Sequence, residues 1–357
     1  MSLQQKIQVS DRPYLIAGPC SVETEEQIHQ VVSELSENEK VQMLRGGIWK
    51  PRTRPDSFEG NGEIALPWLV EAGKKYNLPV AIEIANPKHA ELALKAGVDV
   101  LWIGARTTVN PFAIQDIADS LVGTNVPILI KNPVNPDLGL WIGAFERFQN
   151  AGLNDLTAVH RGFSVYSHPK YRNVPSWEIP IALKEQLPHI PIICDPSHIA
   201  GRRDLLLDVS QKAMDLNFDG LMIEVHPNPD KAWSDAAQQI TPETLKELLS
   251  NLVLRATKIE DSHLLQLEDV RSRIHNLDDR LFEILNNRMK LSEELGFFKR
   301  ANNITILKEE QWKKVVSERL ASIDPELMSP IFIRNLLDVI HQESIRHQNK
   351  IMNSKRG

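Results

Sequence analysis

Short apolar runs alternate with longer amphipathic stretches through the first two thirds of the chain. Eight of these runs are rich in β-branched residues, as is typical of buried parallel strands. In the stretch after each run, apolar residues recur every three or four positions, the spacing of a helix with one buried face. Strands are predicted at residues 13–17, 41–46, 79–84, 98–103, 126–131, 155–160, 190–194 and 219–225. Helices are predicted at about 24–37, 63–76, 87–96, 111–121, 141–151, 177–187, 202–217 and 241–253.

Eight strand and helix units in this length of chain are typical of an α/β protein of the (β/α)8, or TIM barrel, type. A doubly wound open sheet is the structural alternative, because periodicity alone does not exclude it. The number of units in about 240 residues favours the barrel.

The pattern changes from residue 260 onward, where no strand-like run appears. Apolar residues recur there at spacings of three, four and seven, which predicts a long amphipathic helix: Leu267, Ile274, Leu281, Leu285 and Leu295. Two more helices are expected at about 308–321 and 326–350, separated by Asp324-Pro325. We therefore expect a barrel at 1–255, a linker at 256–263 and a small all-α, three-helix dimerising domain at 264–357.

Composition is consistent with two folded domains, since 357 residues exceed the usual size of one core and 42% of them are hydrophobic. The net charge of −6 gives no basic excess that would attract nucleic acid. No apolar run approaches the ~18 residues that a membrane span needs, and the first residues lack a signal peptide's apolar core. We expect a cytoplasmic protein, with no regulatory module before Pro13. The two cysteines, Cys20 and Cys194, exclude a disulfide framework.

Chemically active side chains stand at the predicted carboxyl ends of the strands, where barrels of this type place their active sites. Six cations among them would converge on one mouth, which only a strongly anionic ligand could stabilise. A single arginine would more simply be a solvated loop residue, but six together indicate phosphates or carboxylates. The strand-end residues are Cys20, Glu83, His198, Glu224 and the cations Arg45, Lys50, Arg52, Arg106, Lys131 and Arg161.

Four residues offer sulfur, nitrogen and oxygen ligands to a metal: Cys20, His198, Glu224 and Asp235. This mixture suits a borderline divalent ion of the Mn, Fe, Co or Zn type. Taken alone, Cys20 would be a buried packing thiol and His198 a structural histidine.

Five segments together resemble the 3-deoxy-D-arabino-heptulosonate 7-phosphate (DAHP) synthases of type I-beta. They are AGPCSVE (17–23), LRGGIWKPRTRPDSFEG (44–60), IGART (103–107), CDPSH (194–198) and EVHPNPDKAWSDAAQ (224–238), and the likeness runs through residues 10–253. The resemblance implies metal-dependent condensation of phosphoenolpyruvate with erythrose 4-phosphate, at the start of the shikimate pathway to aromatic amino acids. The 3-deoxy-manno-octulosonate 8-phosphate synthases are the alternative, although KPRT (50–53) favours the four-carbon sugar.

This resemblance also implies roles for individual residues. Cys20, His198, Glu224 and Asp235 match the metal ligands. Arg52 and Thr53 would hold the erythrose phosphate, and Lys50 would be a proton donor between the substrates. The phosphoenolpyruvate site would consist of Arg106, Lys131 and Arg161, with Arg45 and Lys50 close by. At the sixth strand this chain has HRG where many relatives have ERG, which leaves the role of His160 open.

Polar groups interrupt the apolar stripe of the last third of the chain. One cation in such a stripe would extend from the edge of a coiled coil, but several suggest an anionic ligand. Arg271 and Arg288 are 17 residues apart, roughly 25 Å along a helix, so they can meet around one ligand only through an antiparallel second copy.

The segments LEDVRSRIHNLDDRLFEILNNRMKLSEELGFFK (267–299) and QESIRHQ (342–348) resemble the all-helical chorismate mutases. The resemblance implies rearrangement of chorismate to prephenate in a homodimer, with prephenate as a possible feedback ligand. Lys299 and Gln348 would act on the ether oxygen; the site would combine Arg271 of one chain with Arg288, Lys299, Ser344 and Gln348 of the other. The family usually has Asp, Arg and Glu where Lys308, Gln311 and Trp312 stand. Two alternatives remain open, a dimerising sensor of chorismate or prephenate and a purely structural coiled coil.

Overall fold

The structure is a computed structural model that describes residues 1–9, 13–38, 40–50, 58–166, 170–255, 261–307 and 309–353. Contacts divide the chain into two compact units, Met1–Thr257 and Lys258–Gly357. Of the linker predicted at 256–263, residues 256–260 lie outside the described residues, and the last helical region already begins at Asp261.

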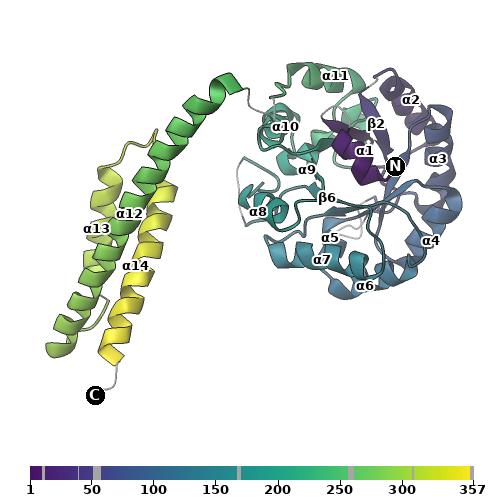
Figure 1. Cartoon of the computed structure of the whole chain (residues 1–357). Coiled ribbons are helices and arrows are strands. Elements are labelled where there is room, and N and C mark those ends of the chain that lie inside the picture. The colour runs from purple at the N-terminus through teal and green to yellow at the C-terminus, as the bar shows by residue number, and fades with distance from the viewer. Residues whose placement is uncertain are drawn as a thin grey trace. The chain divides into compact units, whose positions relative to one another are not determined.

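The first unit is a closed barrel of parallel strands in which each strand pairs with the next and β8 pairs with β1 (Figure 1). The closure confirms the barrel over the open sheet, and every strand lies within two residues of its predicted bounds. The strands are β1 (Tyr14–Gly18), β2 (Val41–Arg45), β3 (Val80–Ile84), β4 (Val100–Ile103), β5 (Ile128–Lys131), β6 (Leu156–His160), β7 (Ile192–Cys194) and β8 (Gly220–Glu224).

Helices surround the barrel at the positions that the periodicity predicts (Figure 1). Several begin where a capping side chain precedes proline, as at Asn86-Pro87, Asn110-Pro111 and Thr241-Pro242. They are α2 (Glu25–Ser36), α3 (Ala65–Lys75), α4 (Pro87–Ala96), α6 (Pro111–Ser120), α7 (Leu138–Asn150), α8 (Glu178–Gln186), α10 (Leu206–Asp215) and α11 (Pro242–Asn251), with the short α5 (Ala105–Thr108) and α9 (Pro196–Ala200) at strand ends.

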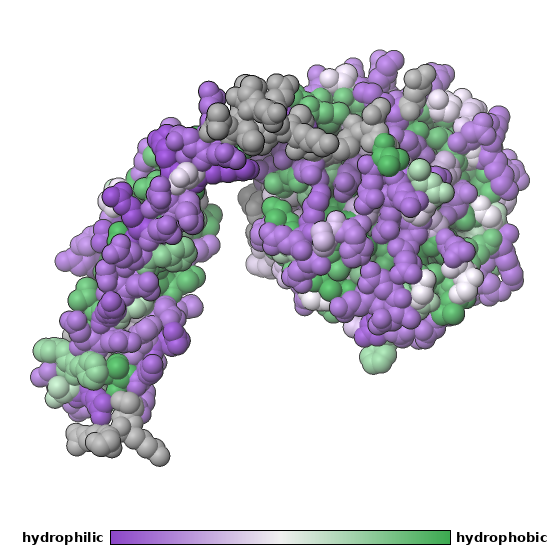
Figure 2. Space-filling view, viewed as in Figure 1, coloured by the Kyte–Doolittle hydropathy of each residue, from purple (hydrophilic) through white to green (hydrophobic). Residues whose placement is uncertain are grey.

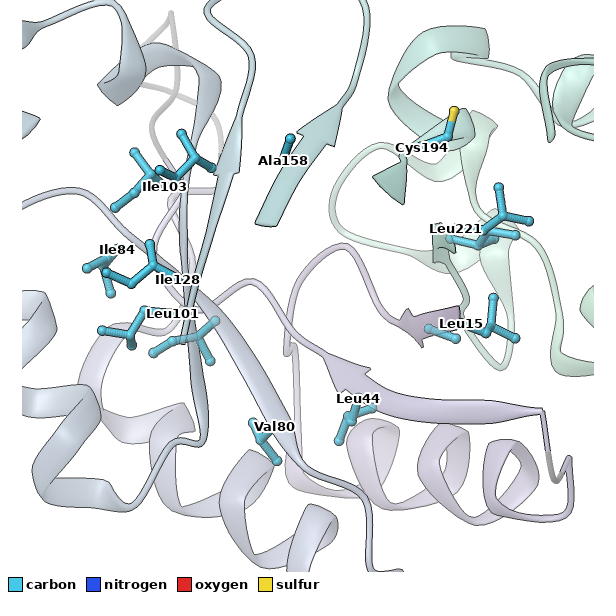
Figure 3. Close-up of a cluster of buried hydrophobic side chains, with 14 of the residues drawn as sticks. Leu15, Leu44, Val80, Ile84, Leu101, Ile103, Ile128, Ala158, Cys194 and Leu221 are labelled. Atoms are coloured by element: carbon cyan, nitrogen blue, oxygen red, sulfur yellow. The ribbon is translucent and has the colours of Figure 1, made fainter. Parts of the chain in front are cut away.

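The barrel has two hydrophobic layers because successive strand residues point to opposite faces. Leu15 and Leu101 pack outward against the helices, in the layer that Figure 3 shows. Ile16 and Trp102 point into the barrel. The inner layer also receives Leu3 and Ile7 of α1 (Leu3–Val9), a helix that the sequence analysis did not predict. Its first turn is held by the Asp155 carboxylate, which accepts hydrogen bonds from the Leu3 and Gln4 amides.

The second unit consists of α12 (Asp261–Ala301), α13 (Glu309–Ala321) and α14 (Pro330–Asn353) (Figure 1). The predicted start of the last helix at 326 was wrong, because Asp324 accepts amide bonds in a turn and Ser329 caps the helix by accepting from Phe332. Gly296 lets α12 and α14 approach closely, since a Cβ there would lie 3.2 Å from the Gln348 Cα. Along the described residues, no helix is both long and apolar enough to cross a membrane; the cytoplasmic location stays a prediction.

Candidate active sites

The Cys20 thiol lies just beyond β1 and is fully buried. Its Sγ donates to Asp235 Oδ2 at 3.3 Å and accepts from Lys50 Nζ at 2.9 Å. Burial, with Glu224 nearby, raises the pKa of Cys20 to about 12. The nearby Lys50 and Arg45 cations oppose this shift but do not cancel it, so the sulfur keeps its proton at neutral pH.

His198 and Glu224, two further candidate metal ligands, lie close together, with His198 Nε2 3.8 Å from Glu224 Oε1. The other ring nitrogen, Nδ1, lies 2.9 Å from Asp195 Oδ1, and Lys131 Nζ donates to the same carboxylate at 2.8 Å. A carboxylate behind a histidine is the usual arrangement that orients a metal-binding imidazole.

The four donors fit a divalent ion by their chemistry. Glu224 Oε1 is buried, faces the Arg45 guanidinium at 3.1 Å and lacks a hydrogen bond to the described residues. The donors nevertheless stand as two pairs, Cys20–Asp235 and His198–Glu224. Among the described residues, no three side chains of His, Cys, Asp or Glu are already gathered as a ligand set.

Cationic side chains gather around the same strand ends. The Arg45 guanidinium and the Lys131 ammonium lie over the ring of buried Trp102, at 5.0 and 5.5 Å from its centroid. Trp102 Nε1 donates to Glu83 at 3.0 Å, which fixes the ring beneath both cations. Burial lowers the pKa of Arg161 to about 10, although Asp195 opposes the shift. An anion bound here would stabilise these charges.

A cavity of about 410 Å³ opens at these strand ends. It is lined both by cations suited to a phosphate or carboxylate and by a predicted metal ligand, among them Arg106, Lys131, Arg161, Arg172 and His198. Of the predicted barrel residues, those that line this cavity are Glu83, Arg106, Lys131, Arg161 and His198. The other described ones are linked by ion pairs or hydrogen bonds to the lining residues or to one another: Cys20, Arg45, Lys50, Glu224 and Asp235. Arg52 and Thr53 lie outside the described residues. A cavity of about 720 Å³ at the opposite end of the barrel is lined by α1 and by residues that precede the strands, such as Pro79 and Asp99. It lacks such a cluster of cations.

His160 is a core residue rather than a member of the cavity lining. It is completely buried, with its ring 5.2 Å from Trp177, 5.8 Å from Phe163 and 6.1 Å from Phe218. Burial, reinforced by Arg161, lowers its pKa to about 3. The histidine at this position is therefore neutral and packs among aromatic rings.

Arg172 is a site residue that the sequence analysis missed. It lines the cavity and donates to both Asp235 Oδ1 and Gln238 Oε1. The neighbouring Asn173 joins Arg161 to the His198 carbonyl. The sequence signal for Arg172 was the segment YRN (171–173). It lies in the connection after strand six, where hydrophobic periodicity makes no prediction.

The helical unit contains a second polar cluster. Ser292 and Ser344 are hydrogen-bonded at 2.7 Å, and Lys299 Nζ donates to Gln348 Oε1 at 2.9 Å. Arg288 is partly buried on the same helix, whereas Arg271 is exposed and is not brought to these residues within one chain. Gln311 is exposed, Lys308 lies outside the described residues, and Trp312 stacks on His341 at 3.9 Å.

The fold and the first site define a barrel enzyme for small, multiply anionic substrates. The chain belongs to the DAHP synthetase I family, whose profile matches residues 2–260, and residues 270–349 match the chorismate mutase type II family. It is therefore a DAHP synthase, which condenses phosphoenolpyruvate with erythrose 4-phosphate, joined to a chorismate mutase, which converts chorismate to prephenate.

Relatives of known function agree with this assignment. The phospho-2-dehydro-3-deoxyheptonate aldolase of Thermotoga maritima is 38% identical over 242 residues, covering 67% of this chain and 68% of the relative. Its crystal structure has a TM-score of 0.60 at 34% identity and covers 67% of each chain. A 2-dehydro-3-deoxyphosphooctonate aldolase of Francisella tularensis is 26% identical over 67% of this chain and 90% of its own length, so the alternative sugar class is more distant.

Proposed function

We propose that the strand-end cations form the phosphoenolpyruvate site, with Arg106, Lys131 and Arg161 on its phosphate and carboxylate and Arg45 beside them. The last three of these cations to be reached along the chain line one cavity, and Arg45 lies with Lys131 over the ring of Trp102; this convergence is the observation that supports the assignment. Arg52 and Thr53 would bind the erythrose phosphate and so set the distance between that phosphate and the reacting aldehyde. A longer sugar phosphate would misplace its aldehyde.

The DAHP synthase family is typically metal-dependent. We propose that a Mn, Fe, Co or Zn type ion is held by Cys20, His198, Glu224 and Asp235. When bound, such an ion acts as a Lewis acid toward the aldehyde oxygen. Asp195 orients His198 through Nδ1, and the same carboxylate positions Lys131. The metal ligands and the phosphoenolpyruvate site therefore share one buried anchor.

Lys50 is the proposed proton donor. Its Nζ lies 2.9 Å from the Sγ of Cys20, one of the proposed metal ligands. Burial works against the charged form, but the hydrogen bond to Cys20 and the charge of Glu224 outweigh it, so the pKa of Lys50 is raised. The ammonium is therefore available to hold a proton at Nζ and to transfer it to the developing alkoxide.

The test is an assay of both reactions on the purified full chain, before and after exhaustive chelation. Chelation and Cys20→Ala should abolish the condensation, and arabinose 5-phosphate should be a poor substitute for erythrose 4-phosphate. Cys194→Ala is the matched control, because Cys194 lies in the hydrophobic layer of the barrel. Full condensation activity in chelated enzyme or in Cys20→Ala would contradict the metal assignment.

For the helical unit we propose a homodimer. The buried residues of α12 and α14 are largely polar, whereas one stripe of α12 is apolar and exposed. Figure 2 shows hydrophobic residues on the visible face of this unit. An antiparallel second copy would cover the stripe and carry its Arg271 toward Arg288. The stripe consists of Ile274, Leu277, Leu281, Ile284, Leu291, Leu295 and Phe298.

In this dimer, chorismate would bind among Arg288, Lys299, Ser344 and Gln348 of one chain and Arg271 of the other. Lys299 and Gln348, already hydrogen-bonded to each other, would stabilise the negative charge that develops on the ether oxygen. Arg288→Ala should remove the mutase and leave the condensation intact, because it changes only the second site. Prephenate bound at the same site is the proposed feedback ligand.

A further inference from the structure

Two polar stripes face each other inside the helical unit. His341, Ser344 and Gln348 share one face of α14, and Arg288, Ser292 and Lys299 share one face of α12. Hydrogen bonds join Ser292 to Ser344 and Lys299 to Gln348, so the two helices run in register. His341 is therefore the group of α14 that lies level with Arg288.

His341 is fixed in place but chemically unsatisfied. Its ring stacks on Trp312 of α13, with centroids 3.9 Å apart and planes within 9° of parallel. The buried His341 Nε2 has no hydrogen-bond partner among the described residues, and neither has the buried Arg288 Nη1. Buried polar groups without partners cost free energy, so one on each of two facing stripes, close enough for the Arg288 charge to act on His341, indicates a ligand with oxygen atoms.

We infer that His341 is a further ligand-binding residue of the mutase site, held by Trp312, and that its Nε2 hydrogen-bonds an oxygen of the carboxylate-bearing ring substrate. This inference rests on the proposed position of that substrate beside Arg288. It also accounts for Trp312, which stands where the family usually has an acidic residue: His341 supplies the hydrogen bond from the neighbouring helix.

A neutral imidazole suits this role. Burial and then the Arg288 cation lower the pKa of His341, Asp338 opposes the shift, and Lys299 adds to it. The ring is therefore uncharged at neutral pH and adds no further cation beside Arg288 and Lys299. An uncharged imidazole can donate to a carboxylate or pair with a hydroxyl group.

Two substitutions separate hydrogen bonding from packing. His341→Phe keeps a ring on Trp312 but removes Nε2, and His341→Gln keeps an N–H donor at similar reach. His347→Phe is the matched control, since His347 lies on the same helix but pairs with Glu293 and Glu343. In the full chain, His341→Phe should lower kcat/KM for chorismate about 10- to 100-fold, with part of the loss recovered in His341→Gln. His347→Phe should stay within about threefold of the parent protein.

Prephenate binding gives a second readout, because Trp312 is the one tryptophan after residue 257. The Trp312 signal is the part of the prephenate-induced fluorescence change that Trp312→Phe abolishes. In His341→Phe, this signal should report a prephenate affinity that is weaker by about tenfold or more. Circular dichroism shows whether His341→Phe has folded. If it has not, the kcat/KM and prephenate affinity of His341→Gln are compared with those of the parent instead.

Unchanged kcat/KM and prephenate affinity in folded His341→Phe would overturn the inference and leave the mutase in place. A parent protein that binds prephenate without rearranging chorismate, while His341→Phe does not bind, would overturn the mutase assignment alone. Failure of the parent in both assays would overturn both.

Discussion

Arg172 donates a hydrogen bond from Nη1 to Asp235 Oδ1 at 3.0 Å. The same guanidinium donates to Gln238 Oε1, and Gln238 Nε2 donates to Glu224 Oε2 at 2.6 Å. Asp235 has a φ of +46°, a left-handed conformation that is unfavourable for a residue with a Cβ. Arg172 therefore holds the carboxylate of a residue whose backbone is strained, and connects it through Gln238 to a second proposed metal ligand.

Arg172→Met should weaken metal binding about 10- to 100-fold, the usual effect of losing a residue that orients a ligand. Arg172→Lys should show a smaller loss, because it keeps the charge but not the forked geometry. The measurement is metal affinity by competition with a chromogenic chelator, which does not depend on turnover.

The matched control for this prediction is Arg202→Met. Arg202 is exposed and pairs with Asp204 rather than with any proposed metal ligand. Its removal should leave the metal affinity unchanged. Equal affinities in the parent and in Arg172→Met would show that Asp235 and Glu224 are positioned without Arg172.

His160 should make the barrel sensitive to acid. Its folded-state pKa of about 3 lies below the ordinary 6.5, because burial and then Arg161 disfavour the charged ring. The unfolded chain binds a proton at this site that the folded chain does not. Stability from this group is therefore complete above pH 6.5 and falls by roughly 1.4 kcal/mol per unit as the pH drops toward 3.

His160→Phe removes this titration while keeping an aromatic ring in the cluster. Its free energy of unfolding, measured by urea titration between pH 7 and pH 4.5, should decline less steeply than that of the parent protein. Substitution of exposed His189 by Phe should leave the slope unchanged. Parallel slopes in the parent and in His160→Phe would show that other groups dominate the acid response.

Periodicity predicted the barrel well because strands covered on both faces and helices covered on one face give distinct patterns. It missed α1, whose two core residues, Leu3 and Ile7, make too short a signal and depend on Asp155, distant in sequence. The motifs identified strand-end residues, but Arg172 lies in a connecting segment with no pattern. His341 was detectable only by its spacing from Ser344, and nothing in the sequence indicates that Trp312 covers it.

The apolar stripe of α12 predicts that one substitution separates the dimer. Leu281→Lys places a charge in the middle of the stripe, where half of the leucine surface is open in one copy. The expected result is a monomer by analytical ultracentrifugation at micromolar concentration, with loss of mutase activity because the proposed site takes Arg271 from a second copy. Glu283→Lys, exposed on another face of the same helix, should remain dimeric. Monomeric parent protein with full mutase activity would contradict the shared site.

Feedback by prephenate follows from linkage if the mutase ligand bridges two chains. A ligand that contacts Arg288 of one copy and Arg271 of the other binds the dimer more tightly than the monomer, so it must stabilise the dimer in return. Any barrel arrangement that depends on the dimer is then biased by the same ligand. A coupling of about 1 to 3 kcal/mol would inhibit the condensation about 5- to 150-fold at saturating prephenate.

Arg288→Ala should retain the condensation and lose the inhibition by prephenate. Arg273→Ala, which removes an exposed arginine of the same helix, should retain both. The measurement is the initial rate of the full chain across a prephenate titration, with binding followed in parallel by calorimetry. A condensation rate that stays constant while the mutase site becomes saturated would show that the two activities share a chain without sharing control.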